Sequence, residues 1–338
     1  MIKPRIFISP ISKNIVDSVI ETAESTNPLG LIPSRRQIEY LGGYSNNWKT
    51  SIWANYVKSQ TNHVLLVRDH GGPEQGHISD PGFDSLYNDC KCMDIIHIDP
   101  WKTVSSVDEG IYKTIQYLKF CHNQNPEIHF EIGTEEAIFK YSAKDLEKIL
   151  YEIKKAVPNI FDKILFAVVQ SGTAITGTKN TGKYSPKRLS EMVEVCQKFD
   201  VSSKEHNGDY LSLDLISSRF SLGLDSINIG PEFGVTETKI LLNLIQDDKA
   251  LIKMFYDLCY QSQKWKKWMP PGYIPKRRSG RGSMPIEEMC DLILVSGHYV
   301  FSEPLFKSLF RKIENNNPNV QNKIKQMLKN KLKTLVKL

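Results

Sequence analysis

The residues best suited to chemistry are histidines and acids that stand at the ends of short apolar runs. The segment RDHGGP, residues 68–73, follows one such run and places Asp69 beside His70. His206 ends another run, VSSKEH. Two imidazoles with one carboxylate can hold a divalent cation and leave positions open for a substrate. We therefore predict a metal site built on His70 and His206.

The oxygen ligand and the proton-handling residue follow from the same pattern. Glu135, or Glu131, could supply the metal-binding oxygen. In an extended strand the side chain of Asp69 would point in a different direction from that of His70. We expect Asp69 to take a proton from a carbon or hydroxyl that a bound metal has polarised. The histidines at strand starts, inside strands or in helices are interpreted as structural: His63, His97, His122 and His129.

Two glycine-bearing segments are suited to bind phosphate. SGTAITGTKNTGK, residues 171–183, offers backbone amides and hydroxyls, and NIGPE, residues 228–232, opens a predicted helix. Phosphate binds well to oriented amides and to the positive end of a helix. Lys179, Lys183 or the arginines within 277–281 could add charge. The two segments predict a phosphorylated small molecule as the ligand.

These residues need a scaffold, and the chain alternates short apolar runs with longer helical patterns. The runs expected to be strands are 5–9, 29–34, 63–69, 94–99, 128–133, 164–170, 201–206 and 226–230. Strands that are apolar along their whole length are buried on both faces, as in a parallel sheet covered by helices. This repeat predicts an α/β fold, a closed (β/α)8 TIM barrel over residues 1–250. An open doubly wound sheet is the alternative, but its G-x-G-x-x-G signature is absent.

Barrel enzymes place their sites at the carboxyl ends of the strands, so the polar residues there are the candidates for function. The candidate catalytic residues are Asp69, Asp99 and Glu135. The candidate substrate-binding residues are Ser34, Gln37, Ser171, Gly172, Thr173, Asp209, Asn228 and Gly230. A single polar strand end is more often solvated surface, but here such residues follow nearly every strand. We expect them to converge on one rim of the barrel.

Residues 251–338 lack strand patterns and are predicted to form a C-terminal helical extension. The extension is interrupted at 268–285, a stretch too long and too rich in Pro, Gly and Arg for an ordinary turn. Within it, the basic segment 275–282 is predicted to contact a phosphate or another subunit. The basic tail 323–338 is predicted to be an amphipathic helix whose apolar face comprises Ile324, Met327, Leu328, Leu332 and Leu335.

The composition is that of a globular protein with a substantial core: 338 residues, of which 40% are hydrophobic and 24% charged. The net charge of +6 is modest, and no aromatic residues interleave the basic tail as a nucleic-acid surface would require. No stretch reaches the roughly 18 apolar residues of a membrane span. Six scattered cysteines fit a reducing compartment. We expect a cytoplasmic protein that binds neither nucleic acid nor membrane.

Seven short segments, evenly spaced along the predicted barrel, occur together in this chain. They are SRRQIEYLGGY (34–44), RDHGGP (68–73), IIHID (95–99), EIGTEE (131–136), VVQSG (168–172), EHNGDY (205–210) and INIGPEF (227–233). In this order they resemble the class II tagatose-bisphosphate aldolase group, and most closely its non-catalytic subunit family. Residues 260–338 match much less clearly. The resemblance implies the barrel fold, a phosphorylated sugar substrate and a divalent metal, zinc.

The resemblance also implies roles for single residues. Asp69 matches the acid/base residue of the catalytic class II aldolases, and His70 matches a zinc ligand. His206 matches a further zinc histidine, and Asn228 matches an asparagine that contacts the ketose phosphate. The remaining zinc histidine should follow the sixth strand, but Ile175 stands at that position and cannot ligate a metal. Zinc is therefore implied with one expected ligand absent.

Three functions are consistent with these features. The first is an aldolase-like lyase that cleaves or forms a carbon–carbon bond in a ketose phosphate with the help of a divalent metal. The second is a non-catalytic subunit that stabilises a separate class II aldolase, and the third is a sugar-phosphate isomerase or epimerase. The polar residues predicted on the rim favour the lyase, because a helper subunit does not need them. We also expect a homo-oligomer.

Overall fold

The computed structural model describes residues 3–134, 140–269, 272–273 and 285–338 of the chain. The predicted site residue Glu135 and the basic segment 275–282 lie outside these described residues. Within the described ranges, no helix combines the length and the apolar character that crossing a membrane requires.

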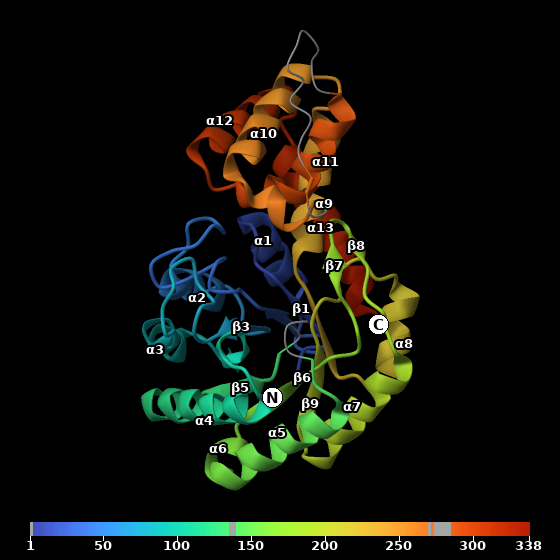
Figure 1. Cartoon of the computed structure of the whole chain (residues 1–338). Helices are drawn as coiled ribbons and strands as arrows, with labels where there is room; N and C mark the ends of the chain where they lie inside the picture. The colour runs from blue at the N-terminus through green and yellow to red at the C-terminus, as the bar shows by residue number, and fades with distance from the viewer. Residues whose placement is uncertain (1–2, 135–139, 270–271, 274–284) are drawn as a thin grey trace.

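Among the described residues, eight parallel strands close into a barrel (Figure 1). They are β1 (Ile6–Ile8), β2 (Leu29–Leu31), β3 (Val64–Gly71), β4 (Ile95–Ile98), β5 (His129–Ile132), β6 (Ile164–Val169), β9 (Ser202–Glu205) and β10 (Ser226–Ile229). β10 pairs with β1 and closes the ring. A small antiparallel hairpin, β7 (Ile175–Thr176) and β8 (Lys179–Asn180), lies in the loop after β6. The predicted runs and the predicted barrel class are confirmed.

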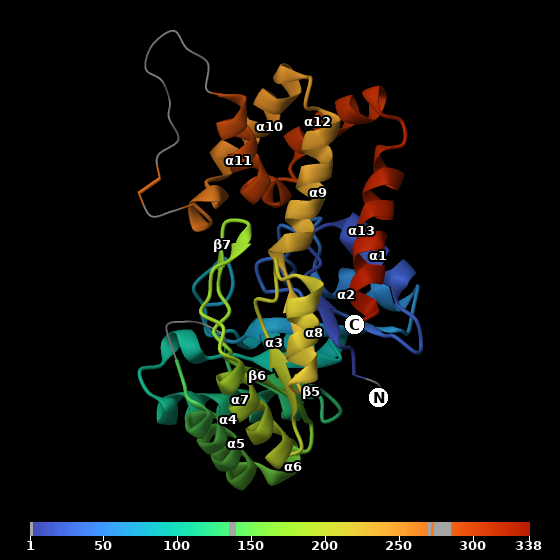
Figure 2. The ribbon, with the colours of Figure 1, turned by 90° about the vertical axis from the view of Figure 1, so that its right-hand side faces the viewer.

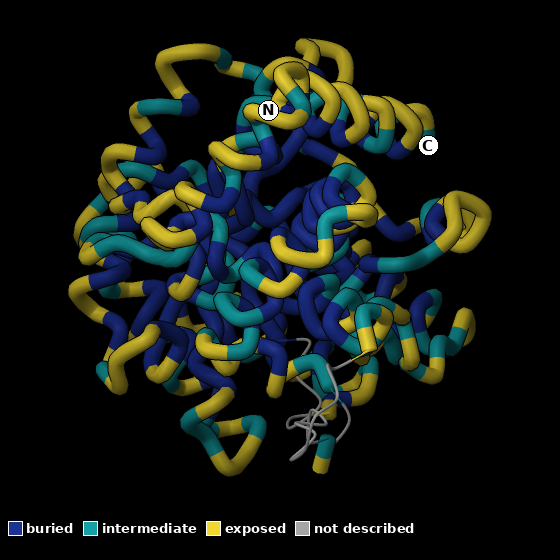
Figure 3. The backbone as a smooth tube through the Cα atoms, turned by 90° about the horizontal axis from the view of Figure 1, so that it is seen from above, coloured by how far each residue is buried: buried dark blue, intermediate teal, exposed yellow. Residues whose placement is uncertain are grey.

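Helices cover the outside of the barrel, and Figure 3 shows a buried centre surrounded by more exposed turns. They are α1 (Lys13–Thr22), α2 (Thr50–Lys58), α3 (Phe83–Cys92), α4 (Val107–Gln124), α5 (Ala143–Ala156), α6 (Pro158–Phe161), α7 (Pro186–Lys198), α8 (Leu213–Ser221) and α9 (Pro231–Leu244). Serine side chains cap α1, α4, α5, α7 and α8. At α5, Ser142 and Asp145 form a reciprocal capping box, so the helix starts where its sequence directs.

The centre of the barrel is filled by a small apolar cluster. Its fully buried members are Phe7, Ile32, Val67, Ile95 and Phe166. Lys204, also fully buried, lies against this cluster with its ammonium nitrogen 3.6 Å from the centre of the Phe7 ring. Side chains alternate along a strand, so residues two positions beyond the cluster also face the inside of the barrel. The strands thereby carry polar side chains inward at their carboxyl ends.

The chain after α9 forms a group of helices at one end of the molecule. It comprises α10 (Lys249–Ser262), α11 (Ile286–Ser296) and α12 (Pro304–Asn316), and α9 leads to it from the barrel (Figure 1). Two short 3-10 helices, Lys264–Lys267 and Gly297–Tyr299, accompany these helices. This group lies over the carboxyl ends of the strands, where the candidate residues were expected.

Helix α13 (Val320–Val336) turns back from this group and runs beside α1 (Figure 2). Its buried face comprises Val320, Ile324, Leu328, Leu332 and Leu335. The predicted amphipathic tail is confirmed except at Met327, which is 49% exposed. On its polar side, Lys325 and Lys329 pair with Glu21 of α1 at 2.8 and 3.0 Å. The basic tail thus packs on the barrel.

Candidate active site

A cavity of about 770 Å³ opens at the carboxyl ends of the strands, between the barrel and the C-terminal helices. The predicted site residues that line it are Ser34, Gln37, Asp69, His70, Thr173, His206, Asp209, Asn228 and Gly230. Asp99, Ser171 and Gly172 are not among the described residues that line it. The structure therefore brings together most of the polar strand ends that the sequence singles out.

A bulge at the end of β3 directs Asp69 and His70 to the same place. The register between β3 and β4 shifts between Arg68 and Gly71, and His70 has a φ of 50°, in the left-handed region. A bulge breaks the alternation of side chains along a strand. As a result, Nε2 of His70 lies 3.6 Å from Oδ1 of Asp69. The prediction that these two side chains point in different directions is wrong.

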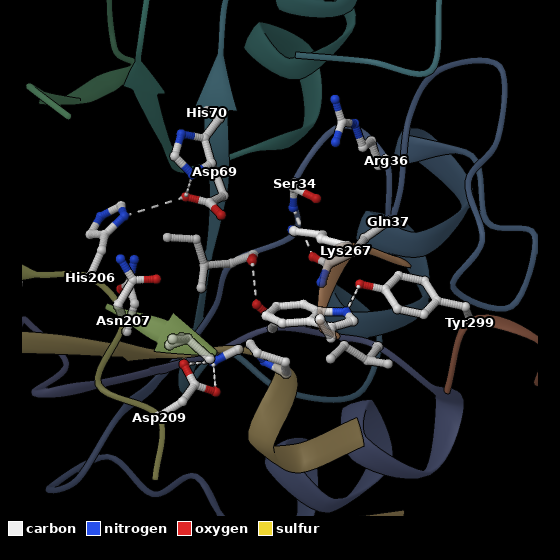
Figure 4. Close-up of a pocket in the computed structure, with 18 of the residues that line it drawn as sticks. Ser34, Arg36, Gln37, Asp69, His70, His206, Asn207, Asp209, Lys267 and Tyr299 are labelled. Atoms are coloured by element: carbon white, nitrogen blue, oxygen red, sulfur yellow. Dashed lines mark hydrogen bonds and ion pairs between the residues drawn. The ribbon is translucent and has the colours of Figure 1, made fainter. Parts of the chain in front are cut away.

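Three histidine rings of the described chain surround one carboxylate oxygen, and Figure 4 shows two of them, His70 and His206, beside Asp69. Nε2 of His70 lies 3.6 Å from Oδ1 of Asp69. Nδ1 of His97 lies 3.7 Å and Nδ1 of His206 lies 3.8 Å from the same oxygen. The rings come from β3, from β4 and from the residue after β9. Distant parts of the sequence thus meet at Asp69; His70 and His206 line the cavity, whereas His97 is fully buried and is not among the described residues that line it.

The opposite nitrogen of each ring is held by a hydrogen-bond acceptor. The pairs are Nδ1 of His70 with Oδ2 of Asp99 at 2.5 Å, Nε2 of His206 with Oε1 of Glu131 at 2.6 Å, and Nε2 of His97 with the carbonyl oxygen of Gly133 at 2.9 Å. A carboxylate or a carbonyl only accepts, so each of these nitrogens carries the ring proton. In the neutral rings, the nitrogens that face Asp69 are therefore the ones with a lone pair, and that of His97 also accepts the backbone N–H of His70 at 3.3 Å.

This donor set fits a divalent metal ion. Two groups of possible ligands have their donor atoms within 4.8 Å of one another: Asp69 with His70 and His97, and His97 with Glu131 and His206. Imidazole nitrogens and carboxylate oxygens are common zinc ligands. A ligating histidine usually donates its other N–H to a carboxylate or a carbonyl. The structure supplies such an acceptor to each of the three rings.

His97 gives the cluster a third imidazole, although Ile175 stands where a ligand is expected. Ile175 lies on β7 and lines the cavity with an apolar side chain. The sequence interpretation leaves His97 out of the site because His97 lies inside a strand. The signal that could have found it is parity: His97 is two positions from Ile95 and two from Asp99, so all three face the inside of the barrel.

Glu131 connects the cluster to the interior of the barrel. It is fully buried, and its Oε2 accepts a hydrogen bond from the ammonium of Lys204 at 2.7 Å. Burial works against the charge on Glu131, but Lys204 and His206 outweigh it and hold the pKa of its carboxyl well below the usual value. Glu131 is thus a charged acceptor that orients the His206 ring. The other predicted oxygen ligand, Glu135, lies outside the described residues.

The glycine-rich segment after β6 is engaged mainly in contacts within the protein. The hydroxyl of Ser171 donates to the carboxylate of Glu205. A Cβ at Gly172 would lie 2.2 Å from a backbone carbonyl oxygen, so this glycine allows a close approach of two chain segments. Thr173 does line the cavity, and its hydroxyl donates to the carbonyl of His206 at 3.1 Å. Of these three predicted binding residues, Thr173 is placed to meet a ligand.

Asp209 occupies the N-terminus of α9, where the sequence predicts a phosphate. Its carboxylate accepts the backbone N–H of Gly230 at 2.9 Å and that of Glu232 at 2.7 Å. Asp209 is 1% exposed, and burial raises its pKa to about 7 in spite of these hydrogen bonds. The amide of Gly230 that was expected to bind phosphate therefore donates to a carboxyl group of the protein.

The opening of the cavity holds residues that the sequence did not single out. On the barrel side, Arg36 lies between Ser34 and Gln37, and the Ser34 amide donates to Oε1 of Gln37 at 2.9 Å. The C-terminal helices contribute Gln263, Lys264, Lys267, Trp268, His298 and Tyr299. No sequence pattern points to these residues, because their place depends on how the extension docks on the barrel.

No family model matches the chain, and no curated protein sequence matches it significantly. Solved structures do share its fold. A probable tagatose 6 phosphate kinase from Sinorhizobium meliloti has a TM-score of 0.75 at 14% identity, and the match covers 99% of this chain and 99% of that chain.

Two further structures connect the fold with sugar chemistry. A fructuronate-tagaturonate epimerase from Cohnella laeviribosi has a TM-score of 0.64 at 10% identity, over 98% of this chain and 81% of that chain. A fructose-bisphosphate aldolase from Campylobacter jejuni has a TM-score of 0.55 at 16% identity, over 93% of this chain and 90% of that chain. At such identities the likeness shows the fold. It confirms the barrel fold that the resemblance to the class II aldolase group implies.

Proposed function

We propose that the protein is a metal-dependent, aldolase-like lyase that acts on a ketose carrying an anionic group such as phosphate. The observation that carries the proposal is the convergence of His70, His97 and His206 on the carboxylate of Asp69. The metal would be held by donor atoms of the two groups that lie within 4.8 Å of one another, Asp69, His70 and His97 or His97, Glu131 and His206. Zinc is the ion we expect. When bound, such an ion polarises a carbonyl oxygen of the substrate.

Asp69 is the residue placed to move the proton. Its carboxylate lines the cavity in the middle of the histidine cluster. In the cleavage direction, Asp69 takes the proton of the hydroxyl group on the carbon that becomes the aldehyde when the carbon–carbon bond breaks. In the synthetic direction it returns that proton to the new hydroxyl. Asp99 and Glu131 keep the rings of His70 and His206 oriented during both steps.

Turnover by the purified chain tests this proposal. With Zn²⁺ and a panel of ketose phosphates and hexuronates, the wild type should release an aldehyde, and a chelator should abolish the reaction. Asp69→Asn should lower kcat by about 10²–10⁴-fold, because it removes the proton acceptor and keeps the shape of the side chain. Asp108→Asn, which changes an acid on α4 that is 75% exposed, is the matched control and should leave kcat unchanged.

Other outcomes identify the other functions. Equal activity of Asp69→Asn and the wild type excludes the proposed role of Asp69. Conversion of a ketose into an epimer without release of an aldehyde would favour an epimerase, a candidate supported by the likeness to the epimerase structure over 98% of the chain. Absence of any turnover, together with stabilisation of a co-expressed class II aldolase, would favour the non-catalytic subunit.

A further inference from the structure

Side chains of both charges line the cavity, and within the described chain the lysines and arginines outnumber the carboxylates. Among the described residues that line it, the carboxylates are Asp69 and Asp209, both on the barrel side. The lysines and arginines that line it are Arg36, Lys102, Lys264 and Lys267, and all four are exposed. We call these four residues the cationic rim. Figure 4 shows two of them, Arg36 and Lys267, apart from Asp209.

Arg35 and Arg36 are adjacent in the chain but differ in their partners. Arg35 is buried and pairs with Glu39 and Asp80 at 2.5 and 2.7 Å. Arg36 is exposed, and its Nε donates to the carbonyl of Gly76 at 3.2 Å. Within the described chain, neither Arg36 nor Lys264 has a carboxylate oxygen within 4.0 Å. Positive charges around the mouth of a cavity attract an anionic ligand.

The alternative place for an anion is already filled. The N-terminus of a helix attracts negative charge, and α9 begins at the cavity. The carboxylate of Asp209 already accepts hydrogen bonds from the backbone N–H groups of Gly230 and Glu232 at this end of α9. A phosphate at that position would have to displace the buried side chain of Asp209, and it would also lie near the carboxyl group of Glu232. The N-terminus of α9 is therefore not open to the anionic part of a substrate.

We propose that Arg36, Lys264 and Lys267 bind the anionic group of the substrate, a phosphate or a carboxylate, at the rim. The carbonyl end of the same molecule lies at the histidine cluster, and only this part of the inference rests on the proposed function. Lys264 and Lys267 belong to the C-terminal helical region. This region thus completes the substrate site and selects for an anionic substrate.

Calorimetric titration of the full chain with three matched compounds tests the inference without any turnover. The compounds are a ketohexose 6-phosphate, a ketohexuronate and the neutral ketohexose. We expect at least one anionic compound to bind more tightly than the neutral one. Arg36→Ala and Lys264→Ala should each weaken binding of the anionic compound by about 10-fold or more and leave that of the neutral ketohexose unchanged. The preference between phosphate and uronate identifies the anionic group.

Lys266→Ala is the matched control, because Lys266 is exposed on the same 3-10 helix as Lys264 and is not among the residues that line the cavity. It should bind all three compounds as the wild type does. Equal affinity for anionic and neutral compounds, unchanged affinity in the rim variants, or no measurable binding of either anion overturns the inference. Rim-dependent binding without turnover would overturn the proposed function alone.

Discussion

Two buried ion pairs lie on the two sides of the barrel wall. Arg68 of β3 faces the outer helices, and its Nη2 and Nε lie 2.7 and 2.8 Å from the carboxylate oxygens of Asp89 on α3. Lys204 of β9 faces inward, and its Nζ lies 2.7 Å from Oε2 of Glu131 on β5. All four side chains are fully buried. The two pairs have the same chemistry in different settings.

They differ in what each pair is connected to. Arg68 also donates to the carbonyls of Pro33 and Ile38, at 2.9 and 2.8 Å, and to a threonine hydroxyl, so its five N–H groups are all used. None of these partners lines the cavity, so this network only fixes β3 against the neighbouring helices and loops. Glu131 instead accepts from His206, whose other nitrogen faces Asp69 in the cavity. A buried charge network that leads to a cavity can serve the site as well as the fold.

The largest effect is expected at the outer pair. Arg68→Met should lower the free energy of unfolding by about 3–5 kcal/mol, because it leaves Asp89 charged and buried without its partner. Urea denaturation measures this loss. The double variant Arg68→Met/Asp89→Leu should recover most of it, since apolar side chains can replace a buried pair. A loss below about 1 kcal/mol, as for a pair on the surface, would contradict the assignment.

The inner pair should instead affect metal binding. Glu131→Gln should weaken zinc affinity by about 10–100-fold, because it removes the charge that orients and polarises His206. Competition with a chromophoric chelator measures the affinity. Glu237→Gln is the matched control: Glu237 is buried, accepts from Ser12 and Asn14, and is not among the residues that line the cavity. Equal zinc affinity of the two variants would remove Glu131 from the site.

A third buried carboxyl group, that of Asp209, has backbone amides as its partners instead of a cation. Its pKa is raised from 3.8 to about 7 in the folded protein. Between these values the folded state binds more protons than the unfolded state, so this group makes stability fall as pH rises from about 4 to about 7. The slope is at most about 1.4 kcal/mol per pH unit.

Asp209→Asn removes this titration and keeps an oxygen that can accept the amides of Gly230 and Glu232. The wild type should therefore gain stability relative to the variant as the pH is lowered from 7 to 4. Denaturation of both proteins across this range measures the difference. A difference that does not change with pH would show that Asp209 has an ordinary pKa.

The fold could be predicted because its signals are local. Each strand is an apolar run of a few residues, and its repetition with helical patterns indicates a parallel barrel. The amphipathic tail also follows from spacing alone, and Ile324, Leu328, Leu332 and Leu335 are buried as expected. Met327 fits the same helical spacing but lies at the edge of the apolar face, which only the packing of α13 on α1 decides.

The site could be predicted only where a single strand end determines it. Asp69, His70 and His206 lie at such ends and do line the cavity. The common direction of Asp69 and His70 depends on a shift of register between β3 and β4, which no run of residues encodes. The carboxylate of Asp209 and the lysines of the cationic rim depend on contacts between segments far apart in the sequence.

The return of α13 onto α1 sets the order in which the chain can fold. Lys329 and Glu21, which pair across these two helices, are 308 residues apart. Contacts between such distant segments form late, because closing the long loop between them costs chain entropy before the contacts can stabilise the fold. During synthesis, α1 therefore keeps one flank in water until α13 has been made. The barrel reaches its final stability only after α13 has docked on α1.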